Sequence, residues 1–172
     1  IECIQRRYKI KMIRYIKEAR PTDVSDLSNL IRKAYRDVAD RFQLTPVNCP
    51  KHPSNCSDDW IEKDLKRGVR YFILMRANTP VGCVAIERAE GDLCYLERLA
   101  VLPQERNRGF GRQLVEHVFR TAREEKAQKI SIGIIAKQAD LKQWYQNIGF
   151  IEGETKEFNH LPFQVCFLTY EL

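Results

Sequence analysis

Residues 99–114, LAVLPQERNRGFGRQL, carry the side chains and spacing best suited to chemistry in this chain. An apolar strand ends at Pro103, a polar loop follows, and a helix is expected to begin at Gly109. Such a loop points several backbone N–H groups and the positive end of a helix dipole at one spot, where a diphosphate would fit. Gly109 and Gly111 would let the backbone approach the anion closely. Three arginines would add positive charge beside it, namely Arg106, Arg108 and Arg112.

Two familiar phosphate-binding motifs do not fit this loop. A P-loop places lysine and then serine or threonine after its second glycine, whereas this chain has Arg112 and Gln113. A Rossmann turn needs glycine or alanine three residues after Gly111, where Leu114 stands. Taken alone, these residues leave open a helix that merely begins with glycines and binds no ligand.

A second group of chemically capable residues lies in the segment 43–57, QLTPVNCPKHPSNCS. Its three prolines exclude regular structure, and its length favours a functional loop. Cys49, His52 and Cys56 could be three zinc ligands, or the two cysteines could form a disulfide. A fourth ligand is not evident, and the two-residue spacing of paired zinc cysteines is absent. We therefore expect no metal here, and a proline-stiffened loop that shapes a substrate pocket.

Hydrophobic periodicity predicts the elements that must position these residues. Helices are expected from a cap at residues 21–23 to Phe42, from Ser57 to Gly68, from Gly109 onward, and over residues 139–148. Seven strands are expected at residues 13–19, 69–76, 80–90, 93–101, 129–136, 150–158 and 163–171. The predicted order is β-α-α-β-β-β-α-β-α-β-β, an α/β fold with a mixed (α+β) sheet.

The composition is that of one globular domain. The chain has 172 residues, of which 44% are hydrophobic and 30% charged, and this excludes disordered and collagen-like classes. No uncharged apolar run approaches the roughly 20 residues of a membrane helix, and no secretory signal follows the basic start. Three of the six cysteines fall inside strand-like runs, where a free thiol behaves as a small hydrophobic group. We expect a reducing, cytoplasmic compartment.

Half of the net charge of +6 lies in residues 1–11, which match nothing around them. We expect this segment to be an upstream extension or an expression remnant, with Met12 as the natural start. Residues 12–172 are then one domain. The charge of this domain is too small to indicate nucleic acid, but it suits a protein that handles an anionic cofactor.

Two motifs together resemble those of the GNAT (Gcn5-related N-acetyltransferase) superfamily. The run Arg106-x-x-Gly109-x-Gly111, entered from a strand that ends in LAVLP, resembles the family's R/Q-x-x-G-x-G/A motif for acetyl-CoA. The run LKQWYQNIGF over residues 141–150 is similar to a second helix motif, A-x-x-L-Y-x-K-x-G-F. The expected element order also fits over about 160 residues. The resemblance implies the GNAT fold, in which the sheet splays between the fourth and fifth strands.

The resemblance further implies an acetyl-CoA-dependent N-acetyltransferase that moves an acetyl group directly to a primary amine. Tyr145 would protonate the departing thiolate, which suits a phenol with an ordinary pKa of about 10. Pantetheine would pair with the strand backbone, the loop would hold the pyrophosphate, and Gln138 stands where the family often has asparagine. The expected contacts with acetyl-CoA are Leu99, Ala100, Val101, Arg106, Asn107, Arg108, Gly109, Phe110, Gly111, Arg112 and Gln138.

The reaction also needs a base for the acceptor amine, and Glu97 is the first candidate. Period-two alternation places it on the same strand face as Leu99 and Val101. The surrounding strand also resembles that of polyamine acetyltransferases in this family, which carries a glutamate at the amine. Glu87 is the second candidate, His117 and His160 are weaker ones, and a solvated strand carboxylate without a role is the alternative.

The acceptor stays open as a small-molecule amine or a protein amine, with Tyr35, Asp37, His52 and Trp60 as candidate wall residues. No membrane and no nucleic-acid partner is expected, and a homodimer is an expectation carried by the family alone. Two other classes remain as alternatives: an acyl-CoA-binding module without catalysis, and a small basic protein associated with nucleic acid or the ribosome.

Overall fold

The structure is a computed structural model that describes residues 14–172. The expected extension over residues 1–11 and the expected start at Met12 lie outside this range. The elements along the chain are β1 (Arg14–Glu18), α1 (Val24–Arg41), α2 (Asp58–Lys66), β2 (Arg70–Arg76), β3 (Thr79–Arg88), β4 (Leu93–Val101), α3 (Phe110–Glu124), β5 (Lys129–Ile135), α4 (Ala139–Ile148), β6 (Ile151–Lys156) and β7 (Val165–Glu171). Three short 3-10 turns lie at Pro21–Asp23, Pro53–Asn55 and Pro103–Glu105. The predicted α/β order is confirmed.

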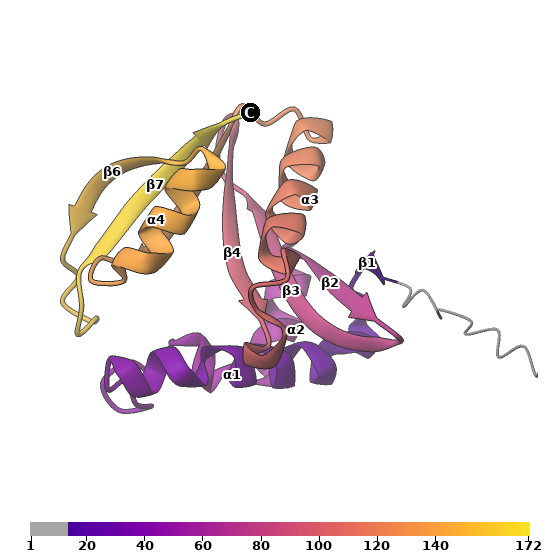
Figure 1. The fold of residues 1–172 in the computed structure, drawn as a ribbon, viewed down its shortest axis with the longest axis horizontal. Helices are drawn as coiled ribbons and strands as arrows, with labels where there is room; N and C mark the ends of the chain where they lie inside the picture. Colours follow the sequence, from indigo (N-terminus) through magenta and orange to yellow (C-terminus); the bar gives the residue numbers. More distant parts are fainter. Residues whose placement is uncertain (1–13) are drawn as a thin grey trace, which may run out of the picture.

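One seven-stranded sheet runs in the order β1-β2-β3-β4-β5-β7-β6. In this described sheet, β4 and β5 form the parallel pair, and their register covers only three positions, from Leu93↔Lys129 to Tyr95↔Ser131. Beyond Tyr95 the two strands diverge, and α4 with β6 and β7 leans away from β4 and α3 (Figure 1). The predicted splay between the fourth and fifth strands is confirmed.

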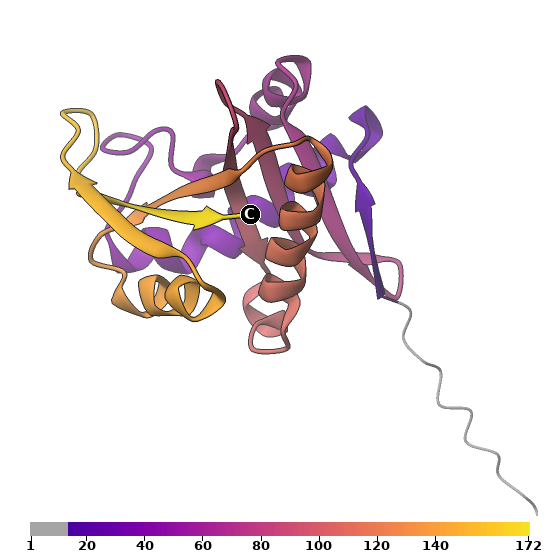
Figure 2. The same ribbon diagram turned by 90° about the horizontal axis from the view of Figure 1, so that it is seen from above.

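Helices cover both faces of the sheet. Seen from above, α3 and α4 lie on one side and α2 on the other (Figure 2). The apolar stripe of α3 is fully buried against the first face, and its members are Leu114, Val115, Val118 and Ala122. The corresponding residues of α1, among them Leu27 and Ile31, pack with α2 against the second face. Each such buried leucine or isoleucine contributes about 1.5–3 kcal/mol of transfer free energy, so the two faces fix where both helices lie.

A third, smaller apolar cluster joins the two halves of the splayed sheet. Ala39 of α1 and Leu44 of the following loop pack with Ile135 at the end of β5, and Phe163 between β6 and β7 packs against them. This contact brings the start of the 43–57 loop to the diverging end of β5.

No helix among residues 14–172 combines the length and the apolar character needed to cross a membrane.

Candidate active site

Six consecutive backbone N–H groups at the start of α3, those of residues 107–112, have no acceptor within the described part of the chain. The first paired amide is that of Gln113, which donates to the Gly109 carbonyl at 3.1 Å. The dipole of this helix adds about half a positive charge at the same end. The arrangement can bind an anion that carries several oxygens, such as a pyrophosphate.

The two glycines of the loop serve different purposes. Gly109 has φ +80°, and an added Cβ would meet nothing within 4 Å, so the surface above it is open. At Gly111 an added Cβ would lie 3.1 Å from the Trp144 ring of α4. A side chain at Gly111 would therefore press on Trp144 where α3 packs against α4, a contact that the sequence did not indicate.

Arg106 turns away from the loop surface and holds the loop to α1. Its guanidinium pairs with both carboxylate oxygens of Asp37, at 2.5 and 3.2 Å. It also donates to the Ala34 carbonyl at 2.6 Å and to the Val101 carbonyl at 3.2 Å. The hydrogen bond from Arg106 lowers the pKa of Asp37, so the pair is charged at neutral pH. The sequence predicted an anion contact for Arg106, whereas its side chain fixes the loop.

The other two arginines remain half exposed beside the loop. Arg108 approaches Glu105 at 3.4 Å, and Arg112 approaches the Asn147 carbonyl at 3.4 Å. Neither contact is short enough to occupy the guanidinium fully. Both groups can therefore turn toward an anion at the start of α3.

β4 presents an unpaired edge after it leaves β5. The Leu102 N–H donates to the Val81 carbonyl at 3.0 Å, so alternation along the ladder turns the N–H and carbonyl groups of Leu99 and Val101 away from β3. The register with β5 ends at Tyr95, so no strand within residues 14–172 pairs with them on that side.

Protein groups already bind the two carbonyls of this edge. The Tyr35 hydroxyl donates to the Leu99 carbonyl at 2.9 Å, and Arg106 donates to the Val101 carbonyl. The N–H groups of Leu99 and Val101 are left directed toward the side on which β5 diverges. They are the groups with which an inserted ligand could pair.

A β-bulge precedes this edge. Ala85 of β3 lies opposite Glu97 but Cys83 lies opposite Ala100, so β4 contains one extra residue. Arg98 is in the left-handed region with φ +52°, which is uncommon for a residue with a side chain.

The bulge reverses the faces that alternation predicted. Leu96 and Leu99 both pack on the α3 side although they are three residues apart. Glu97, next to Leu96, therefore faces α1 and α2. The prediction that Glu97 shares a face with Leu99 and Val101 is wrong, because the extra residue shifts the alternation between them.

The surroundings of Glu97 make its carboxyl a weaker acid. Burial raises the pKa of Glu97, against the opposing effect of the Arg98 guanidinium. Glu87 and Asp64 act with burial, since their negative charges lie nearby. Glu87, the second candidate, is itself ion-paired with Arg67.

Tyr145 is buried in α4, with 4% of its surface exposed. Its ring meets Trp144 and Phe150 edge-on, with centroids 4.9 and 5.2 Å away. Its hydroxyl has no hydrogen-bond partner among residues 14–172. Burial raises the pKa of this phenol, and the nearby Tyr35 acts in the same direction, so the hydroxyl keeps its proton.

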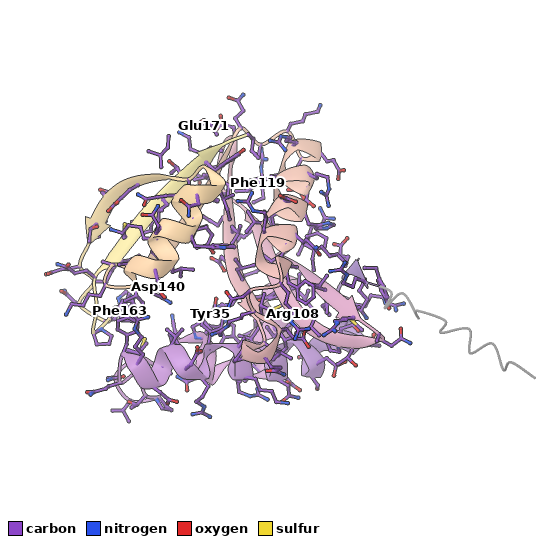
Figure 3. All side chains as sticks on the ribbon, in the orientation of Figure 1. Tyr35, Arg108, Phe119, Asp140, Phe163 and Glu171 are labelled. Atoms are coloured by element: carbon purple, nitrogen blue, oxygen red, sulfur yellow. The ribbon has the colours of Figure 1, made fainter. Side chains whose placement is uncertain are left out.

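The start of α4 lies across the splay from the α3 loop. Gln138 immediately precedes α4, and its backbone N–H donates to the Ile135 carbonyl at 2.9 Å. In Figure 3, Tyr35 lies between Asp140 at the start of α4 and Arg108 in the loop before α3. The Tyr35 hydroxyl also donates to the Leu99 carbonyl, which places it beside the open part of β4.

The structure separates the residues considered as zinc ligands. Cys49 and Cys56 are free thiols buried in two different apolar clusters. His52 is bound to Ser54, with Nδ1 and Oγ 2.8 Å apart, and burial lowers the pKa of His52 to about 4. Across the described range, no three His, Cys, Asp or Glu side chains are grouped so that they could hold a metal ion. The zinc alternative therefore has no support in this loop.

Three further candidates, one for the acceptor pocket and two for the base, pack against other side chains of the protein. Trp60 lies under the Arg98 guanidinium at 4.3 Å, and the His117 ring packs against Phe72 at 4.4 Å. His160 lies beside Phe158. The sequence missed the bulge at Arg98, because nine strand-like residues without glycine give no local signal for one.

Comparisons with known proteins agree with this geometry. Residues 28–150 match the family model described as the acetyltransferase (GNAT) family. An uncharacterized N-acetyltransferase of Schizosaccharomyces pombe is 42% identical over 59 residues, which are 34% of this chain, and the match spans 40% of the length of that curated relative.

Solved structures share the fold. PaiA N-acetyltransferase from Thermoplasma acidophilum, in complex with coenzyme A, superposes with a TM-score of 0.78 at 11% identity, over 94% of this chain and 100% of that one. The ribosomal-protein-S18-alanine N-acetyltransferase from Escherichia coli gives 0.73 at 15% identity, over 92% of this chain and 94% of that one. The predicted fold is confirmed.

Proposed function

The chain belongs to the acetyltransferase (GNAT) family, and from this premise we propose that it transfers an acetyl group from acetyl-CoA directly to a primary amine. The observation that carries the proposal is the run of six unpaired N–H groups at residues 107–112, beside the open edge of β4. A pyrophosphate fits this run, because the surface above Gly109 is open and two half-exposed arginines lie beside it.

The open edge of β4 would receive the pantetheine arm. When bound, acetyl-CoA supplies an acetyl group that is activated as a thioester. The backbone around Leu99 and Val101 would pair with the arm, and the Val101 N–H would polarise the thioester carbonyl.

Two side chains would move the protons. The amine nitrogen bonds to the acetyl carbon while the carbon–sulfur bond breaks. Glu97 accepts the proton that the amine loses, directly or through a water molecule, and Tyr145 donates its proton to the thiolate. Burial raises the pKa of the Cys56 thiol to about 11, and direct transfer requires no cysteine nucleophile.

Calorimetric titration of acetyl-CoA and of free CoA into the purified chain tests the proposal. Micromolar binding of both is expected, together with thiol release on adding at least one member of a panel of small amines, polyamines, amino acids, and peptides with free termini or lysines. Binding without turnover across the panel would favour the CoA-binding module. Absence of binding would contradict the proposal.

Asp37→Asn and Arg106→Gln are each expected to weaken acetyl-CoA binding roughly tenfold. Both variants release the loop from α1, because they break the same ion pair. If Arg106 acted only by its charge on the phosphates, removing the neighbouring carboxylate of Asp37 would strengthen binding. Calorimetry of both variants and of the double variant separates the two explanations. If the two residues form one shared anchor, the double variant should lose no more affinity for acetyl-CoA than either single variant.

Glu97→Gln is expected to lower kcat by about 10- to 100-fold. A carboxyl must be ionised to act as a base, so activity of the unmodified chain should rise with pH through a pKa above that of an ordinary glutamate. This ascending limb should disappear in Glu97→Gln. Glu87→Gln is the matched control. If the lower kcat and the loss of the ascending limb appeared in Glu87→Gln instead of Glu97→Gln, Glu87 would be the base.

A further inference from the structure

One turn of α1 holds both outward carbonyls of the open β4 edge. Tyr35 donates to the Leu99 carbonyl at 2.9 Å. On either side of it, the Ala34 carbonyl and the Asp37 carboxylate hold Arg106, which donates to the Val101 carbonyl. The edge therefore offers its N–H groups to a ligand while its carbonyls are already occupied.

The Tyr35 hydrogen bond acts next to a strained position. Leu99 follows Arg98, whose left-handed conformation persists only where the surroundings fix it. Arg98 is fixed from α2, through the Trp60 ring and Asp64 at 3.6 Å. Tyr35 supplies a second restraint from α1, on the residue that follows the strained position.

Tyr35 itself is well placed to give this restraint. Its ring meets His52 edge-on, with centroids 5.8 Å apart, and His52 is held by Ser54. Burial raises the pKa of the Tyr35 phenol, so it stays a neutral donor. Its electrostatic influence reaches Tyr145, the proposed proton donor on α4.

We propose that Tyr35 is a positioning residue for acetyl transfer: its hydrogen bond occupies the Leu99 carbonyl on the open edge, so that the Val101 N–H polarises the thioester without an opposing free carbonyl. The Leu99 carbonyl lies between the N–H groups of Leu99 and Val101 along the edge. Without the Tyr35 hydroxyl, the negative end of this carbonyl would be uncompensated and would repel the charge that develops on the thioester oxygen. The inference rests on the proposed function.

The test uses acetyl-CoA labelled with ¹³C at the acetyl carbonyl, bound to the full chain, and needs no acceptor. Infrared spectroscopy reports polarisation of the thioester as a shift of its carbonyl band to lower wavenumber on binding. Tyr35→Phe is expected to lose at least about half of this shift while Kd changes less than about threefold. With any accepted amine, kcat should fall roughly tenfold at little-changed KM for acetyl-CoA.

Ser28→Ala is the matched control, because it also removes a buried hydroxyl from α1. Ser28 bonds to the Ser25 carbonyl and to Asp58, far along the helix from β4. It should lower thermal stability to a degree similar to Tyr35→Phe and keep the full band shift. Spectra are recorded below the melting transition of both variants.

Two results would overturn the inference while leaving the proposed function intact. One is an unchanged band shift in Tyr35→Phe. The other is a weaker Kd with unchanged band shift and unchanged kcat, which would make Tyr35 a structural residue only. Failure of the unmodified chain to bind acetyl-CoA would instead remove the proposed function, and the inference with it.

Discussion

Replacing Gly109 by aspartate is expected to raise the Kd for acetyl-CoA at least about 100-fold. Two effects act together in Gly109→Asp. The residue has φ +80°, a conformation that strains most side-chain-bearing residues, although aspartate tolerates it better than most. The larger effect is electrostatic, because a carboxylate placed among the six unpaired N–H groups would compete for them and repel the pyrophosphate. Calorimetric titration measures the change directly.

Gly91→Asp is the control for the backbone effect. Gly91 also has positive φ, +70°, and an added Cβ there meets nothing within 4 Å. It lies in the turn between β3 and β4, away from the start of α3. This variant should lose a similar amount of stability and retain its affinity for acetyl-CoA. Near-normal binding by Gly109→Asp would show that the anion binds elsewhere.

Tyr145→Phe is expected to lower kcat by about 10²- to 10⁴-fold, the range typical of a lost general acid. The hydroxyl has no protein partner among the described residues, so its removal should leave the melting temperature and the affinity for acetyl-CoA nearly unchanged. Steady-state kinetics with an accepted amine, together with calorimetry, measures both quantities. Because burial raises the pKa of Tyr145, its titration should not produce a fall in activity near neutral pH.

Tyr170→Phe supplies the comparison for loss of a tyrosine hydroxyl elsewhere. Tyr170 lies in β7, with its ring stacked on Phe119 at a centroid distance of 4.1 Å. This variant should keep full kcat. If Tyr145→Phe were equally active, the thiolate would take its proton from another donor or from water.

The elements of this fold could be predicted because their signals are local. The apolar spacing from Leu114 to Ala122 predicts a helix, and α3 spans Phe110–Glu124. The isoleucine-rich run after Lys129 predicts a buried strand, and β5 spans Lys129–Ile135. Each pattern depends on residues that are within one or two helical turns, or a few strand positions, of each other. The spacing of the apolar residues that become buried then distinguishes a helix from a strand.

The location of the candidate site could also be predicted from the sequence, whereas the roles of several of its side chains could not. The loop before α3 combines glycine, arginine and a helix start within a few residues, so its unpaired amides could be expected from the chain alone. The direction in which the Arg106 side chain points could not be predicted in this way, because its partner Asp37 is 69 residues away along the chain. The same holds for Tyr35 and the Leu99 carbonyl, which are 64 residues apart.

Local sequence therefore determined the order of elements, the loop proposed to bind the anion and the positions of Glu97 and Tyr145 along the chain. Only the tertiary structure decided which way β4 turns its side chains and carbonyls. The left-handed conformation of Arg98 depends on Trp60 and Asp64 from α2, and no spacing within β4 encodes it. Once α1 and α2 pack across the sheet, that one extra residue puts Leu99 and Val101 on the face opposite Glu97, because strand alternation carries a single shift to every residue that follows. The edge itself is open because β5 diverges after Tyr95.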